Sequence, residues 1–178
     1  MTSIINTGCP ELIKFQVVIS STAQDTILET LHPIAEDWAR VRLLGTSVYG
    51  IRRYKAGSWL ATHLDRIDTH VISVIINVAQ RGGQAGGWPL VIGDHEGEVH
   101  RIRLRPGEML LYESAKLPHG RPDTFTGDFF DNIFVHFKPR SKAWWRSGGV
   151  RWDAGDLPAW SIEIHQGDAG TQNIVRKK

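Results

Sequence analysis

Two histidines and two aspartates lie within the nine residues THLDRIDTH, just before the apolar run VISVII. Burying an unpaired charge beside such a run is costly, so these side chains need partners. Side chains alternate between the two faces of a strand, so His63 and Asp65 point the same way and can reach a single ion. Asp68 and His70 lie past this pair, where we expect a solvated turn, with substrate contact as the alternative.

A third ligand for such an ion must come from elsewhere in the chain. The best candidate is His119 in SAKLPHGRP, which follows the expected strand MLLYES. Two histidines and a carboxylate on one face of an octahedron leave three positions open, as in non-haem Fe(II) oxygenases. Without His119, His63 and Asp65 would more often be an ion pair at the end of a strand than a pair of metal ligands.

The surrounding pattern predicts mainly β structure. Residues 12–20 are expected to form a strand, and apolar residues at helical spacing between 27 and 41 predict a helical segment. Because Pro33 falls inside that segment, we expect a kink or a junction of two helices there. About eight short strands with frequent turns follow, and no βαβ unit is visible. This order predicts an antiparallel sandwich or jelly roll with flanking helices on one side.

Length and composition limit the function classes. The 178 residues suggest one domain over 1–140 and a Trp-containing C-terminal extension over 141–178, partly packed, with its last residues flexible. A net charge of +2 is too balanced to indicate nucleic acid or an anionic membrane as a partner. Cys9 is the single cysteine, and neither a secretory signal nor a transmembrane run is apparent. We expect a cytoplasmic protein with a small-molecule or peptide substrate; the oligomeric state stays open.

Four stretches resemble a known family. YKAGSWLATHLD, THVISVIINV, LRPGEMLLYESAKLPHGRP and NIFVHFKP resemble the Fe(II)/2-oxoglutarate dioxygenases, and most closely their prolyl 4-hydroxylase-like branch. The resemblance implies a cupin-like double-stranded β-helix, with His63, Asp65 and His119 as ligands of Fe(II). It also implies 2-oxoglutarate and O₂ as cosubstrates, with ascorbate as a supporting reductant. The implied reaction is hydroxylation of an unactivated C–H bond, most of all in a prolyl residue or a proline-like amino acid.

The resemblance also implies residues that hold 2-oxoglutarate. Tyr54 matches a tyrosine that often donates a hydrogen bond to this cosubstrate. Prolyl hydroxylases carry a Lys or Arg about ten residues after the distal histidine, to hold the distal carboxylate. Here that register contains no base, since it reads Asp128, Phe129 and Phe130. Arg121, two residues after His119, is the first substitute.

Other residues are further candidates near the cosubstrate. Arg52 and Arg53, beside Tyr54, come next as bases, followed by His136. Asn77, on the expected buried strand, is a candidate polar group close to 2-oxoglutarate. If none of the bases reaches the site, the chain would instead be a barrel that binds a metal or small ligand without turnover. An oxygenase acting on a small metabolite and an interaction domain that uses the Trp-rich tail are the remaining alternatives.

Overall fold

The computed structural model describes residues 14–141, 163–166 and 172–175. In this part of the chain one helix and twelve strands are formed. Their bounds are β1 (Lys14–Val17), α1 (Ser21–Ala39), β2 (Leu43–Val48), β3 (Ile51–Tyr54), β4 (Leu60–Leu64), β5 (Ile72–Arg81), β6 (Leu90–Gly93), β7 (Val99–Ile102), β8 (Met109–Tyr112), β9 (His119–Arg121), β10 (Phe129–Pro139), β11 (Glu163–Gln166) and β12 (Gln172–Val175).

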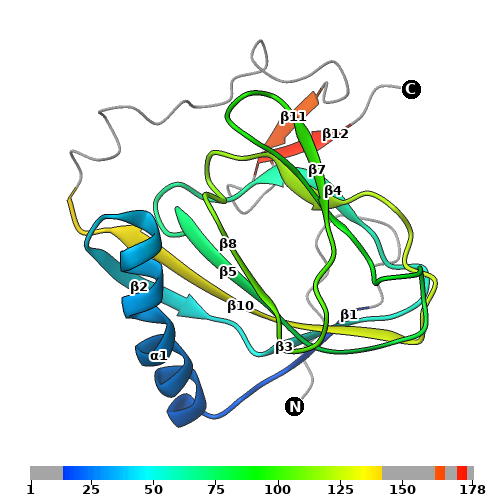
Figure 1. Cartoon of the computed structure of the whole chain (residues 1–178), viewed down its shortest axis with the longest axis horizontal. Helices are drawn as coiled ribbons and strands as arrows, with labels where there is room; N and C mark the ends of the chain where they lie inside the picture. Colours follow the sequence, from blue (N-terminus) through cyan, green and yellow to red (C-terminus); the bar gives the residue numbers. More distant parts are fainter. Residues whose placement is uncertain (1–13, 142–162, 167–171, 176–178) are drawn as a thin grey trace.

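The strands of the described residues form two antiparallel sheets of six strands each. The first has the order β1-β3-β10-β5-β8, with β2 also paired to β10, and the second has the order β11-β12-β4-β9-β6-β7. The two sheets face each other across the barrel (Figure 1). This is a double-stranded β-helix, and the predicted jelly-roll class is confirmed. No helix among the described residues is long and apolar enough to cross a membrane.

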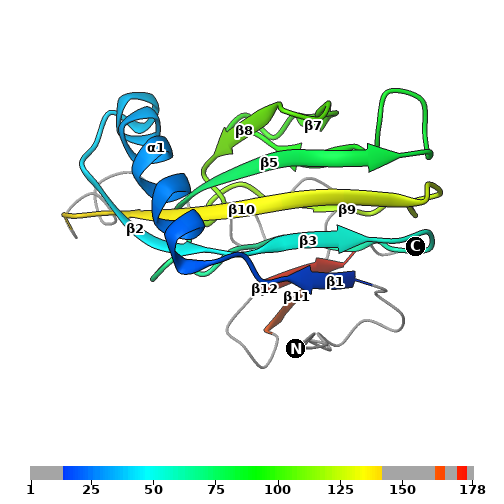
Figure 2. The same ribbon diagram turned by 90° about the horizontal axis from the view of Figure 1, so that it is seen from below.

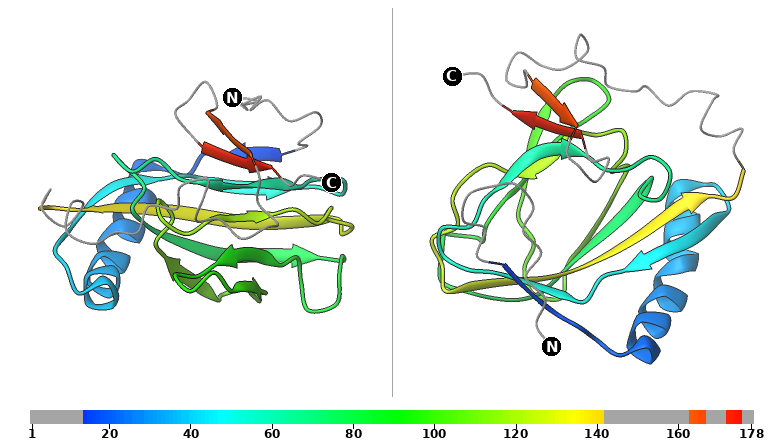
Figure 3. Two further views of the ribbon diagram at one scale, coloured as in Figure 1. Left: turned by 90° about the horizontal axis from the view of Figure 1, so that it is seen from above. Right: turned by 180° about the vertical axis from the view of Figure 1, so that it is seen from behind.

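The expected C-terminal extension lies mostly outside the described residues. Two short strands in it, β11 and β12, pair with each other, and β12 pairs with β4 in the register Asn173 to His63. They extend the second sheet on the side of the barrel away from α1 (Figure 3). The backbone of β4, which carries the first candidate ligand, therefore has a hydrogen-bonded neighbour on both edges.

Helix α1 lies outside the barrel, against the first sheet (Figure 2). Ser20 caps it by accepting a hydrogen bond from the backbone N–H of Ala23, and Arg40 ends it in the left-handed conformation. The expected junction of two helices is wrong, because α1 runs through Pro33 as one element. Tertiary packing of its apolar face outweighs the hydrogen bond that the proline removes.

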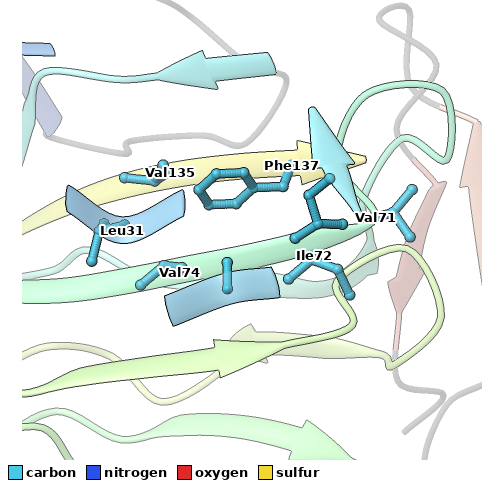
Figure 4. Packing of buried hydrophobic residues seen from close by; sticks show 8 residues of the cluster. Leu31, Val71, Ile72, Val74, Val135 and Phe137 are labelled. Carbon is cyan, nitrogen blue, oxygen red and sulfur yellow. The ribbon is translucent and has the colours of Figure 1, made fainter. Parts of the chain in front are cut away.

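Packing under α1 fixes the outer face of the first sheet. Leu31 and Ala35 of the helix contact the sheet residues Val135 and Phe137 and the neighbouring Val74, all of which are buried (Figure 4). Since alternate residues of β10 face opposite ways, burying these two on the outside turns their neighbours into the barrel. The helix therefore sets which polar side chains of β10 face the interior.

Candidate metal centre

The two candidate histidines face each other across neighbouring strands. Strands β4 and β9 are antiparallel, and His63 lies directly opposite His119 in their register. Their ring centroids are 4.4 Å apart. Gly120 makes this close approach possible, because a Cβ there would lie 2.7 Å from the carbonyl oxygen of Ala61. The pairing of β4 with β9 thus brings the two imidazoles together.

Asp65 completes a group of three ligand atoms. Its Oδ1 lies 3.5 Å from Nε2 of His63 and its Oδ2 lies 3.9 Å from Nε2 of His119. The three ligand atoms all lie within 4.8 Å of one another. The spacing suits a single ion placed between them, which would take one nitrogen or oxygen from each side chain.

The backbone sets the tautomer of both histidines. Nδ1 of His63 is 2.9 Å from the carbonyl oxygen of Ala61, and Nδ1 of His119 is 2.9 Å from that of Leu117. A carbonyl can only accept, so each Nδ1 carries the proton and each Nε2 turns a lone pair toward the group. Two imidazole nitrogens and a carboxylate oxygen are the ligand set that ferrous oxygenases use, so the residues present fit Fe(II).

The charge states of the three groups also suit a metal. Burial lowers the pKa of His119 to about 4, and the charge of His63 acts in the same direction. Burial alone would raise the pKa of Asp65, but contact with His63 and the charge of His119 hold it well below its usual range. Near neutral pH His119 is therefore neutral and Asp65 is ionised, as metal ligation requires.

A buried guanidinium lies next to this group. Arg121 follows His119 by two residues on β9 and is only 2% exposed. Its guanidinium carbon lies 5.0 Å from the ring centroid of Trp88 and 4.7 Å from that of Phe130, and Nη1 donates to the carbonyl oxygen of Trp88. Burial lowers its pKa to about 10, so the group stays charged at neutral pH. No carboxylate of the described residues lies within 4.0 Å of this cation.

Arg121 packs on a residue of the register in which the resemblance implies a base. Phe130, in that register, contributes the aromatic ring on which the guanidinium lies. This buried cation belongs to β9, on the other sheet, and not to β10. Tyr54 lies in the same aromatic cluster, with its ring centroid 5.2 Å from that of Trp88.

The other candidate bases separate into different environments. Arg53 points outward and forms an ion pair with Asp131, with Nη2 2.6 Å from Oδ2. Arg52 points inward, with Nη1 3.5 Å from the hydroxyl of Tyr54. His136 is buried, and burial lowers its pKa to about 3, so it offers no positive charge near neutral pH. Arg53 and His136 are therefore poor anchors for a carboxylate.

Asn77 is buried, but its amide nitrogen is already engaged. It donates to the carbonyl oxygen of Leu104 over 2.7 Å and to Oε1 of Gln80 over 2.9 Å. These bonds tie β5 to the segment before β8. Its Oδ1 has no hydrogen-bond partner, so only this atom is left for a ligand.

Asp68 lies in an exposed turn beside Arg66, as expected, whereas His70 is not in the solvated position that we expected. His70 is half-buried; Nε2 is 3.2 Å from the hydroxyl of Tyr49, and its ring centroid is 3.9 Å from that of His136. The solvated position expected for it is wrong, because strands distant in sequence cover it. No local pattern could have shown this, since Tyr49 comes from the connection between β2 and β3 and His136 comes from β10.

Asn132, which the sequence reading did not single out, is fully buried on β10. Neither the nitrogen nor the oxygen of its amide group has a hydrogen-bond partner among the residues that the structure describes. It lies directly opposite Arg52 in the pairing of β10 with β3. The alternation of NIFVHF could have shown that it faces the interior, but not that it lacks a partner there.

Comparisons with known proteins agree with this geometry. No family model and no curated protein matches the sequence. An oxidoreductase of the 2OG-Fe(II) oxygenase family from Burkholderia pseudomallei matches with a TM-score of 0.53 and 17% identity, over 70% of this chain and 62% of that one. A Pseudomonas putida prolyl-4-hydroxylase matches with a TM-score of 0.56 and 17% identity, over 72% and 73% of the two chains.

The chain has the fold of the 2-oxoglutarate–Fe(II) oxygenases. At 17% identity the two matches show the fold alone, and the chain spans less than two thirds of the Burkholderia protein. A cupin domain from Bordetella pertussis is more distant, with a TM-score of 0.34 and 14% identity over 55% of this chain and 93% of that one.

Proposed function

We propose that this protein is an Fe(II)- and 2-oxoglutarate-dependent oxygenase that hydroxylates an unactivated C–H bond. One observation carries the proposal. His63, Asp65 and His119 bring a ferrous ligand set together, and Arg121, a buried cation with no carboxylate partner among the described residues, lies two residues from His119. A barrel that only bound a metal would gain nothing from the buried Arg121, because a buried unpaired charge destabilises the fold.

Each residue then has a distinct role. His63, Asp65 and His119 would hold the iron, which supplies the activation of O₂ when it is bound. Arg121 would hold the distal carboxylate of 2-oxoglutarate through charge-assisted hydrogen bonds, and Tyr54 would donate a further one. One oxygen atom of O₂ enters the C–H bond, and the other enters succinate as 2-oxoglutarate loses CO₂.

The walls of the barrel suit oxidative chemistry. Trp88, Phe125 and Phe130 are each no more than 1% exposed and close the end near Arg121. Ile75 and Phe134 form an apolar wall on the first sheet. Exclusion of water strengthens the charge interactions inside and limits side reactions of the oxidant.

We assign a prolyl residue or a proline-like amino acid as the first substrate class, on the resemblance of the sequence to prolyl 4-hydroxylases. A small metabolite is the second class, since no described element forms a separate peptide-binding domain. The test is a panel of prolyl peptides, proline-like amino acids and small metabolites. The class that raises succinate release above the level without substrate is the substrate class.

Asp65→Ala tests the proposal directly. Under anaerobic conditions, addition of Fe(II) and then 2-oxoglutarate to the wild-type protein should give the weak visible charge-transfer band of the chelate. The variant should lose the band and the succinate formation triggered by substrate. Asp68→Ala is the matched control, because that carboxylate is exposed in the same loop and pairs with Arg66. Full turnover in Asp65→Ala would refute the metal site, and binding of both ligands without turnover by the wild type would favour the binding barrel.

A further inference from the structure

Arg52 is a second cation of the barrel interior, and the proposed chemistry does not use it. Its guanidinium carbon lies 4.8 Å from the ring centroid of Phe134 and 6.0 Å from that of Tyr49. No carboxylate of the described residues lies within 4.0 Å of it. The next residue, Arg53, has Asp131 as a partner on the outer face. The fold thus supplies a counter-ion to the outward arginine and none to the inward one.

An unpartnered amide lies beside this cation. Asn132 is directly opposite Arg52 on β10, so both side chains lie on the inner face of the sheet. The amide group of Asn132 is fully buried, and within the described part of the chain neither its nitrogen nor its oxygen has a hydrogen-bond partner. Leaving buried polar groups unpaired is unfavourable, so their persistence together points to a ligand that pairs with them.

We infer that Arg52 and Asn132 form a subsite for a carboxylate group of the substrate. This inference rests on the proposed function and specifies its substrate class, a small molecule with a free carboxylate. Arg52 supplies charge-assisted donors, and Nδ2 of Asn132 supplies a neutral donor from the adjacent strand. A prolyl residue in the interior of a peptide has no such group, so the subsite favours a free amino acid or another organic acid.

The positions of the two arginines indicate that they serve different anions. Both arginines interact with Tyr54, but Arg52 also interacts with Asp65 and His136, whereas Arg121 interacts with Tyr112. Arg121 is nearly inaccessible, which suits a cosubstrate bound deep in the barrel. Arg52 is half-buried, which suits a substrate that enters later.

The formal charges of the site also favour assigning Arg52 and Arg121 to different anions. A ferrous ion, Asp65, Arg121 and doubly ionised 2-oxoglutarate together carry no net charge. Arg52 then adds one uncompensated positive charge to a poorly solvated interior. A singly charged carboxylate on the substrate neutralises it, whereas a neutral substrate would leave it uncompensated.

The experiment measures binding with redox-inert Mn(II) in place of iron. Thermal protection of the full chain is followed with Mn(II) and 2-oxoglutarate, and then with added monocarboxylates, namely L-proline, acetate, propionate and benzoate, each beside its carboxamide. We expect at least one acid, and none of the amides, to give saturable protection of the wild type. Arg52→Met should weaken it roughly ten- to a hundredfold and leave 2-oxoglutarate affinity within threefold. Arg52→Lys should restore part of it.

Two further variants make the result decisive. Asn132→Leu removes the amide at similar volume and should weaken acid binding with no loss of fold stability, because no hydrogen bond is broken. Arg81→Met is the control, since this exposed arginine pairs with Asp128 outside the barrel. The inference is overturned if no acid protects, if acids protect Arg52→Met equally, or if that variant loses 2-oxoglutarate binding instead. If the wild type does not bind 2-oxoglutarate at all, the proposed function is refuted. The acid titration is therefore also run without 2-oxoglutarate, so that the carboxylate subsite is tested independently of the proposed function.

Discussion

Replacing Arg121 by methionine should raise the stability of the ligand-free protein and weaken its binding of 2-oxoglutarate. Methionine has a similar length and a flexible, polarisable chain, so it can occupy the space between Trp88 and Phe130. The variant removes a buried charge and leaves the apolar surroundings in place. A residue that served the fold alone would not couple a gain in stability to a loss of ligand affinity.

The size of the gain follows from the burial of the guanidinium. Burial lowers the pKa of Arg121 from the ordinary value of an arginine side chain to about 10. At about 1.4 kcal/mol per pKa unit, keeping the charge costs the folded state about 3 kcal/mol. This cost is present at every pH below the folded pKa, so it applies in full at neutral pH. Loss of the hydrogen bond to Trp88 offsets about 1 kcal/mol, which leaves an expected gain of about 2 kcal/mol in the free energy of unfolding.

Two measurements on the same samples test this reasoning. Urea unfolding of the ligand-free protein should show a higher midpoint for Arg121→Met than for the wild type. The stabilisation given by 2-oxoglutarate with Mn(II) should fall as its affinity drops about a hundredfold, the loss expected for charge-assisted hydrogen bonds. Arg121→Lys keeps the charge without the planar fork and should lie between the two. Equal affinity of Arg121→Met and the wild type for 2-oxoglutarate would refute the assigned anchor.

Three further predictions concern the fold around the site. Burial lowers the pKa of His119 to about 4 and that of His136 to about 3, so below the ordinary histidine pKa of 6.5 the unfolded chain binds more protons than the folded one. On acidification from pH 6.5 toward pH 4, each histidine should therefore lower the free energy of unfolding by about 1.4 kcal/mol per pH unit. A free energy of unfolding that stays flat from pH 7 to 5 would contradict this. Gly120→Ala should destabilise the fold by about 1–3 kcal/mol and reduce Mn(II) affinity, because its Cβ meets the backbone of β4 at Ala61; unchanged Mn(II) titration would oppose that account. Ser73→Ala should destabilise the fold by about 1–3 kcal/mol in urea unfolding, since it removes the hydroxyl 2.6 Å from Nδ1 of His136, yet leave Mn(II) affinity unchanged.

The metal group shows what a local pattern can predict. Period-two alternation alone places His63 and Asp65 on one face, and the structure has them on one face. Alternation alone does not place His119, because its position opposite His63 depends on the pairing of β4 with β9, which are distant in sequence. Alternation also predicts the directions of the neighbouring arginines: if Tyr54 faces inward, Arg52 faces inward and Arg53 faces outward.

The contacts of the buried polar residues were harder to predict. His70 follows a turn, and its sequence neighbours suggest solvent, but Tyr49, just after β2, and His136, on β10, cover it. The lack of any partner for Asn132 is likewise a property of the assembled barrel. Such contacts are set by the register between strands, and a single sequence carries only weak information about that register.

The location of the anchor has a mechanical consequence. His119 and Arg121 lie at the two ends of a three-residue strand and share its inner face, so β9 would carry a proposed metal ligand and the proposed cosubstrate anchor together. A slip of β9 by one residue would turn both away from the barrel at once. Gly120 between them is fixed by its close approach to β4, which resists such a slip. Where the base lies on β10, as in the prolyl hydroxylase register, metal affinity and cosubstrate affinity can vary independently. In this chain, changes to the backbone of β9 should weaken both together, whereas changes on β10 should weaken only the binding of small molecules.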